Sequence, residues 1–170
     1  MEYRETFKYS IYAITLIILQ LFIFNYVHLS QNITASIFII LILTLPIKLS
    51  KISVLIIAFV YGLFFDILNN TLAVNTASLS LVAFVRPYLL ELIKGGDIFE
   101  ANSKPSIKLF GFFKFAIYSF ILLSFYHFFV NFLDIFSFKK IGFIFLKTTF
   151  NSIFSLFFVL ILCMTFYKND

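Results

Sequence analysis

The stretch "YGLFFDILNNTLAVN" (residues 61–75) decides the fold, because it sets one carboxylate and a polar turn between two long apolar segments. Asp66 follows a run of aromatic and aliphatic side chains, and the polar residues 69–71 come within one helical turn of it. Apolar segments on both sides of so short a turn predict two helices, at residues 52–68 and 72–93. Each is long enough to cross most of the roughly 30 Å of hydrocarbon in a bilayer.

The composition extends this prediction to the whole chain. Hydrophobic residues make up 62% of 170 residues and charged residues 12%, and the mean hydropathy is +1.04, whereas soluble domains average about 45–50% apolar and about 25% charged. The sequence therefore predicts one all-α integral membrane domain over residues 1–170, a bundle of about six transmembrane helices with no room for a large soluble domain. The predicted helices are residues 10–27, 33–47, 52–68, 72–93, 112–133 and 143–166. If the break at Pro46, Lys48 and Lys51 is only a kink, the count falls to five.

The distribution of basic residues predicts the orientation, because cytoplasmic loops carry an excess of Lys and Arg. With six helices, nine basic residues share one side: Arg4, Lys8, Lys48, Lys51, Lys94, Lys104, Lys108, Lys114 and Lys168. The other side has Lys139, Lys140 and Lys147. Both termini are thus predicted to be cytoplasmic. The polar stretch 94–108 is predicted to be a loop on the membrane surface. The net charge of +5 then reflects lysines near anionic lipid headgroups, and it gives no argument for nucleic-acid binding.

Asp66 has two interpretations that the residues leave open. Ala58, Gly62 and Asp66 recur every four residues, the small-xxx-small spacing that lets another helix approach closely, so this face is predicted to contact protein. Asp66 either caps the turn or the helix that follows it, together with Asn69, Asn70 and Thr71, or it pairs with a binding partner near the outer surface. Under the second interpretation, this face and the adjoining part of the next helix form the partner-binding site: Ala58, Gly62, Asp66, Asn70, Asn75 and Arg86.

Two further polar features lie within predicted helices. Arg86 is expected in the cytoplasmic third of its helix, where it snorkels to lipid phosphate as an anchor or contacts a headgroup or partner. Ser124, His127, Asn131 and Asp134 are spaced three, four and three residues apart, which predicts one polar stripe facing protein or water. We favour interhelical hydrogen bonds for this stripe over a metal site or a proton relay, with Asn151, Ser152 and Ser155 of the last helix as partners.

Catalysis and cofactor binding are not expected. The chain has no Gly-rich phosphate loop, no HExxH helix and no nucleophile motif with a base. Its single cysteine, Cys163, lies inside the last apolar segment, so neither a disulfide nor a thiolate metal site can form within the chain.

The polar positions together resemble a known family. "GLFFDILNNTLAVNTASLSLVAFVRPYLLELI" (residues 62–93) and "YSFILLSFYHFFVNFLDIFSF" (residues 118–138) resemble the rod shape-determining MreD family, in its Bacteroidota form. The matching positions are Gly62, Asp66, Arg86, Pro87, His127 and residues 136–138. The resemblance covers nearly the whole chain.

The resemblance implies a multi-pass protein of the bacterial inner (cytoplasmic) membrane that acts in the regulation of cell shape and in peptidoglycan synthesis. Members act as non-catalytic scaffolds of the elongasome. The implied partners are the single-pass protein MreC and, through it, a cell-wall transpeptidase, a membrane glycosyltransferase and the MreB filament.

The family is also said to share its fold with the substrate-binding subunits of energy-coupling-factor vitamin transporters. That supplies the alternative function, a substrate-binding membrane subunit of a small-molecule transporter. Asp66, Asn75, His127 and Asn131 would then line a polar outer pocket.

Overall fold

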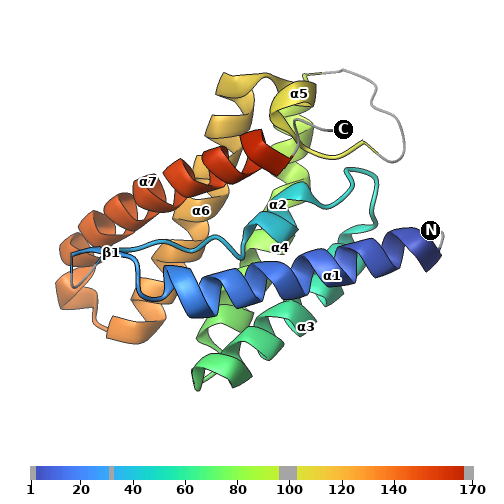
Figure 1. Cartoon of the computed structure of the whole chain (residues 1–170). Helices are drawn as coiled ribbons and strands as arrows, with labels where there is room; N and C mark the ends of the chain where they lie inside the picture. The colour runs from blue at the N-terminus through green and yellow to red at the C-terminus, as the bar shows by residue number, and fades with distance from the viewer. Residues whose placement is uncertain (1–2, 31–32, 96–102, 167–170) are drawn as a thin grey trace.

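The computed structural model describes residues 3–30, 33–95 and 103–166, and this part is mostly helical (Figure 1). In chain order the elements are α1 (Tyr3–Leu19), a π-helical turn (Gln20–Phe24), β1 (His28–Ser30), β2 (Ile33–Thr34), α2 (Ile40–Thr44), α3 (Lys51–Asn69), α4 (Val74–Lys94), α5 (Ile107–Phe110), α6 (Phe112–Ile135), a 3₁₀ turn (Phe138–Lys140) and α7 (Ile141–Phe166).

Four helical stretches among the described residues are long and apolar enough to cross a membrane, namely α3, α4, α6 and the stretch that contains α7. Their ends lie within about two residues of the predicted ends. A shorter apolar helix, Tyr9–Phe24, covers all but the last three residues of the first predicted span, residues 10–27. These helices agree with the predicted class, an all-α membrane protein.

The prediction of a helix over residues 33–47 is wrong for most of that range. β2 pairs antiparallel with β1, and the chain then runs without regular structure until α2, which has only five residues. Every residue from 35 to 45 is buried. A continuous apolar run indicates burial but does not distinguish an extended segment from a helix. Irregular backbone is tolerated at membrane depth where protein surrounds it, and that is the situation of this segment.

The helices pack around this buried segment. α3 packs against α4, α4 against α6, and α6 against α7, while α2 contacts α1 and α4, and β2 contacts α7. In Figure 1 the segment that follows β1 runs past α1 and α7 into α2. The Phe38 ring stacks on Phe65 of α3 with centroids 3.9 Å apart and meets Tyr126 of α6 edge to face. The buried segment therefore links α3 to α6 through the core.

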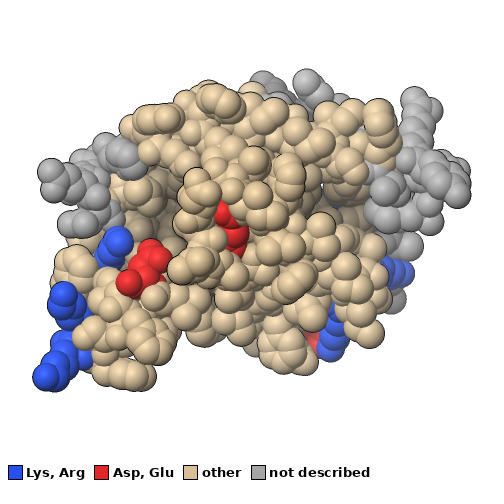
Figure 2. Space-filling model, turned by 90° about the horizontal axis from the view of Figure 1, so that it is seen from below, with Lys and Arg blue, Asp and Glu red and all other residues tan. Residues whose placement is uncertain are grey.

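The outward faces of the helices are apolar. On α7, Phe143, Leu146, Phe150, Ile153 and Phe157 are all about half exposed, and α3 presents a similar face. Large contiguous apolar surfaces are rare on soluble monomers and are expected where lipid is the solvent. In the face shown in Figure 2, basic side chains lie only at the two ends, and the wide middle carries only a small acidic spot. This pattern matches a membrane-embedded middle between two aqueous ends.

Two connections lie where the sequence predicted them, the break before α3 and the loop before α6. α3 begins where Ser50 accepts a hydrogen bond from the Ser53 N–H at 3.0 Å, which ends the break that starts at Pro46. Of the predicted loop 94–108, residues 96–102 lie outside the described part of the chain. The rest of that loop contains α5, which Ser106 caps.

Candidate functional site

Asp66 is a buried cap at the beginning of α4. Its Oδ1 accepts hydrogen bonds from the Thr71 hydroxyl and from the Asn75 N–H and Nδ2 at 3.1 and 2.8 Å. Its Oδ2 accepts from the Thr76 N–H at 2.7 Å and from the Thr76 hydroxyl at 2.6 Å. α4 begins at Val74, so these two N–H groups lie in its first turn, where no intrahelical carbonyl reaches them. The carboxylate satisfies both and places its negative charge at the positive end of the helix.

The small-residue face of α3 is occupied by the chain itself. A Cβ on Gly62 would lie 2.7 Å from Thr76 Cα, so α4 packs directly on this glycine. Ala58 is fully buried, and Asp66 is 2% exposed. The face contacts protein, as predicted, but the protein is α4 rather than a partner. A helix from another chain cannot lie there while α4 remains in place.

Two of the other three predicted partner-binding residues are also buried within the chain. Asn75 is 8% exposed and Arg86 is 1% exposed, and only Asn70, in the left-handed turn that ends α3, is exposed. Five of the six predicted residues therefore contribute to the interior of this chain.

Arg86 does not snorkel to the membrane surface, so the anchor interpretation is wrong. Its Nη2 donates to the Leu45 carbonyl, and its Nε donates to the Tyr118 hydroxyl at 3.1 Å. That hydroxyl in turn donates to the Leu43 carbonyl at 2.9 Å. Both carbonyls lie at the end of α2, where no further turn supplies donors. Arg86 is thus a buried cation that satisfies the end of a short helix, and within the described chain it forms no ion pair with a carboxylate.

Side chains from three helical elements, the π-helical turn, α3 and α7, satisfy the backbone of the buried segment. Gln20 acts at two groups: its Nε2 donates to the Ala35 carbonyl at 2.9 Å, and its Oε1 accepts from the Ile37 N–H at 2.7 Å. Three further bonds complete the set: Thr34 N–H to Asn151 Oδ1 at 3.3 Å, Ser36 N–H to Ser155 Oγ at 2.9 Å, and the Tyr61 hydroxyl to the Phe38 carbonyl at 3.2 Å. These side chains supply the hydrogen bonds that a buried extended segment needs, because such a segment has no helical partners of its own.

The polar stripe of α6 faces protein along most of its length. His127 Nε2 lies 2.9 Å from Ser155 Oγ, and Asn131 Nδ2 donates to Thr148 Oγ1 at 3.2 Å. The predicted hydrogen bonds to the last helix are therefore present at His127. Asp134 is exposed at the end of α6, and Ser124 is half-buried. Within the described residues no group of three or more potential metal-ligating side chains is present.

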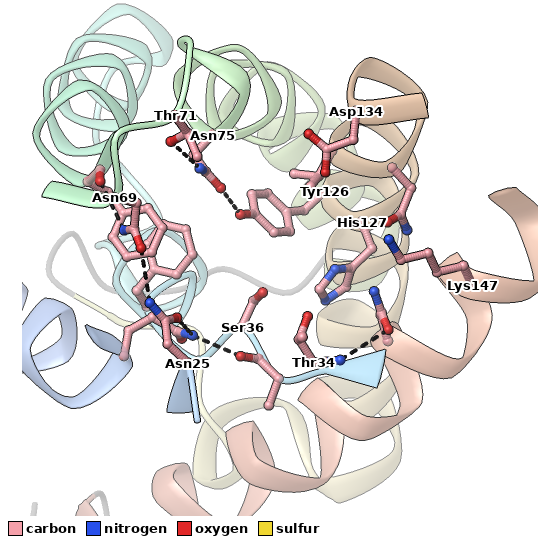
Figure 3. A pocket seen from close by; sticks show the side chains of 17 residues that line it. Asn25, Thr34, Ser36, Asn69, Thr71, Asn75, Tyr126, His127, Asp134 and Lys147 are labelled. Carbon is pink, nitrogen blue, oxygen red and sulfur yellow. Dashed lines mark hydrogen bonds between the residues drawn. The ribbon is translucent and has the colours of Figure 1, made fainter. Parts of the chain in front are cut away.

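A polar pocket of about 430 Å³ lies between these elements, and Figure 3 shows its lining side chains. Thirteen of its 17 lining residues carry polar side chains. Of the four residues that the alternative function predicts, Asn75, His127 and Asn131 line it. Asp66 does not line it, because its carboxylate is engaged with Thr71, Asn75 and Thr76.

Sequence reasoning missed several lining residues: Gln20, Asn25, Ser36, Tyr126 and Lys147. Gln20 and Asn25 are isolated polar residues near the end of an apolar run. Polar residues in such a position indicate a buried or functional site, so the sequence could have identified them. Gln20 Nε2 donates to Asn25 Oδ1 at 3.1 Å, and Asn25 Nδ2 donates to Asn69 Oδ1 at 3.0 Å. This amide chain joins the first helix to α3 along the wall of the pocket (Figure 3).

The polar side chains of this region either hold the helices together through hydrogen bonds or face the pocket, where they can bind a small molecule. A pocket of this volume falls within the roughly 300–1,000 Å³ of small-molecule sites, although it is more polar than most. No protein-family model, curated protein or solved structure matches the chain.

Proposed function

We propose that the chain is a non-catalytic membrane scaffold of the bacterial cell-wall elongation complex, the function implied by its resemblance to the MreD family. One observation supports this function. The two charged residues of the resemblance, Asp66 and Arg86, both face inward and bind the chain's own backbone. Residues used in this way preserve a fixed shape, which is what a scaffold needs from its membrane domain.

The proposal includes a location and partners. The protein lies in the inner membrane with both termini in the cytoplasm. It binds a single-pass MreC-like protein, and through it a transpeptidase, a glycosyltransferase and, indirectly, an MreB-like filament. Because α4 covers the small-residue face of α3, a partner helix would bind an outward face of the bundle instead.

The experiment combines depletion with partner capture. Depletion should make rod-shaped cells wider and rounder. The tagged chain, extracted in mild detergent from its own membranes, should retain a single-pass protein with a periplasmic coiled coil together with cell-wall synthases. Gly62→Leu should abolish capture and fail to restore shape, because it separates α3 from α4. Gly142→Leu is the matched control, since a Cβ there meets nothing within 4 Å. Unchanged cell shape after depletion, with no cell-wall enzyme captured, would refute the scaffold.

The polar pocket favours a second candidate, a substrate-binding subunit of a small-molecule transporter, with a fold like that of the energy-coupling-factor subunits. The supporting observation is a partly open pocket of small-molecule size lined by Asn75, His127 and Asn131. In the same capture experiment, this candidate predicts an ATPase and its transmembrane coupling subunit in place of cell-wall synthases.

A further inference from the structure

Two opposite charges line the pocket without being paired to each other. Asp134 comes from the end of α6 and Lys147 from the second turn of α7, and both belong to the lining (Figure 3). Within the described part of the chain, neither forms a hydrogen bond or a contact salt bridge, although the Lys147 charge acts on the Asp134 carboxylate through space. The pocket therefore offers one anionic and one cationic position to a ligand. Its net charge from these two groups is zero, which matches a zwitterion better than an anion or a cation.

Deeper in the pocket, two buried amides each have one atom without a partner. Asn131 is 2% exposed and Asn151 is 3% exposed. Asn131 uses its Nδ2 on Thr148, and Asn151 uses its Oδ1 on the Thr34 N–H. This leaves the Asn131 Oδ1 as a free acceptor and the Asn151 Nδ2 as a free donor in the described structure.

One free acceptor and one free donor are what a single peptide group requires, because a peptide group carries one N–H and one C=O. A polar atom that faces a pocket without a protein partner is available to bond to water or to a ligand. Within the described residues, neither amide atom is buried and sealed off from solvent. Both atoms can therefore be reached from the pocket.

The size of the pocket limits the ligand. Two residues of extended peptide span at most about 7 Å, and a cavity of about 430 Å³ accommodates such a molecule with modest side chains. A wholly apolar ligand would leave the charges of Asp134 and Lys147 and the remaining amide atoms of Asn131 and Asn151 without partners.

We propose that this pocket binds a small peptide with free ends, of dipeptide size. Its carboxylate lies at Lys147, its ammonium group at Asp134, and its peptide group between Asn131 and Asn151. The pocket lies at the end of the bundle that holds the α3–α4 and α6–α7 turns, so the ligand enters from the side opposite the lysine-rich loops.

The test is equilibrium dialysis of the purified full-length chain in detergent micelles against a mixture of free-ended dipeptides. The retained molecules are quantified by mass spectrometry. A parallel dialysis uses the same dipeptides with acetylated amino groups and amidated carboxyl groups, which have the same peptide bond but no charges. The wild-type chain should concentrate a subset of the free-ended dipeptides and none of the blocked ones.

Three variants locate the binding. Lys147→Met and Asp134→Asn should each lower retention about tenfold, the effect of removing one charge-assisted hydrogen bond. Lys140→Met is the matched control, because Lys140 is exposed and does not line the pocket, and it should leave retention unchanged. Thermal unfolding of each variant without ligand shows that the fold is kept.

Three results would overturn the inference: no dipeptide retained, blocked dipeptides retained equally well, or full retention by both pocket variants. The inference concerns the pocket of the isolated chain, whereas the proposed function concerns captured partners, so either one can fail while the other holds.

Discussion

Two carboxylates near helix ends have opposite environments in this molecule. Asp66 accepts five hydrogen bonds and is 2% exposed, whereas Asp134 is exposed and accepts none from the described residues. The difference comes from the chain that follows each one. After Asp66 a short turn brings the first N–H groups of α4 back to the carboxylate. After Asp134 the chain passes through Phe136 in a left-handed conformation, with φ of 40°, and none of the N–H groups that follow it donates to the carboxylate.

The comparison teaches that residue type alone does not assign a role. We call Asp66, Thr71, Asn75 and Thr76 the closed cluster, because the carboxylate at its centre is fully engaged by the chain. The pocket lined by Asp134 and Lys147 is the open pocket, because its charges remain available. The closed cluster should determine stability, and the open pocket should determine binding.

The largest effect is expected for Asp66→Ala. It removes the acceptor of five donors, including two N–H groups in the first turn of α4, and the expected loss is about 3 kcal/mol of unfolding free energy. For a chain of this length that corresponds to a fall in Tm of roughly 6–12 °C. The single cysteine, Cys163, is 3% exposed, so its reaction with a fluorogenic thiol probe reports unfolding. Asp134→Ala is the matched control and should change Tm by less than about 2 °C. Equal falls in Tm for Asp66→Ala and Asp134→Ala would show that the two carboxylates contribute equally to stability and would refute the distinction between them.

The next effect tests the close packing behind the closed cluster. Gly62→Ala places a Cβ 2.7 Å from Thr76 Cα and 3.1 Å from Thr76 N, and backbone atoms cannot yield as a flexible side chain can. We expect a destabilisation of about 2 kcal/mol, read as an earlier reaction of Cys163 on heating. Gly142→Ala, also in a helix but with open space around it, should be neutral or slightly stabilising. Wild-type stability of Gly62→Ala would show that α4 does not pack where the structure has it.

The sequence predicted the regular parts of this molecule well and the buried segment poorly. α3, α4, α6 and α7 have long apolar runs that end in turn residues or charge, and both signals are local. The segment at residues 35–39 has the same apolar composition, but its conformation depends on side chains far away in the chain. Gln20 and Ser155, 17 and 119 positions from their bonding partners, are what make an extended backbone possible there. No local pattern contains that information.

The candidate site shows the same limit. The stripe on α6 was predictable because its spacing is helical, and the capping role of Asp66 was one of two interpretations that the residues allowed. Arg86 was misplaced because its depth along a helix suggested snorkelling, whereas the carbonyl ends of α2 exist only in the folded chain. The pocket needed six separate elements to be brought together, which spacing along one helix cannot reveal.

A moderate effect on stability is expected where the closed cluster meets the open pocket. Tyr126 lines the open pocket, and its hydroxyl donates to Oδ1 of Asn75, whose Nδ2 donates to Asp66. Tyr126→Phe leaves that buried amide oxygen without a donor at nearly constant side-chain volume, and the expected cost is about 1 kcal/mol. Tyr26→Phe, at a residue that is 78% exposed, is the control and should leave Tm unchanged. A cost as large as that of Asp66→Ala would mean that the clusters form one cooperative unit.

The smallest effect on stability is expected for Lys147→Met, and it is the most informative about function. Lys147 has no hydrogen bond or ion pair in the described structure, and its aliphatic stem keeps its packing as Met, so Tm should change by less than about 2 °C. If Tm falls by much more, the ammonium group stabilises the fold through contacts that the structure does not show, and the open pocket then resembles the closed cluster. If Tm is unchanged while dipeptide retention falls, this lysine serves a ligand, because its attraction to Asp134 then contributes little to the stability of the fold.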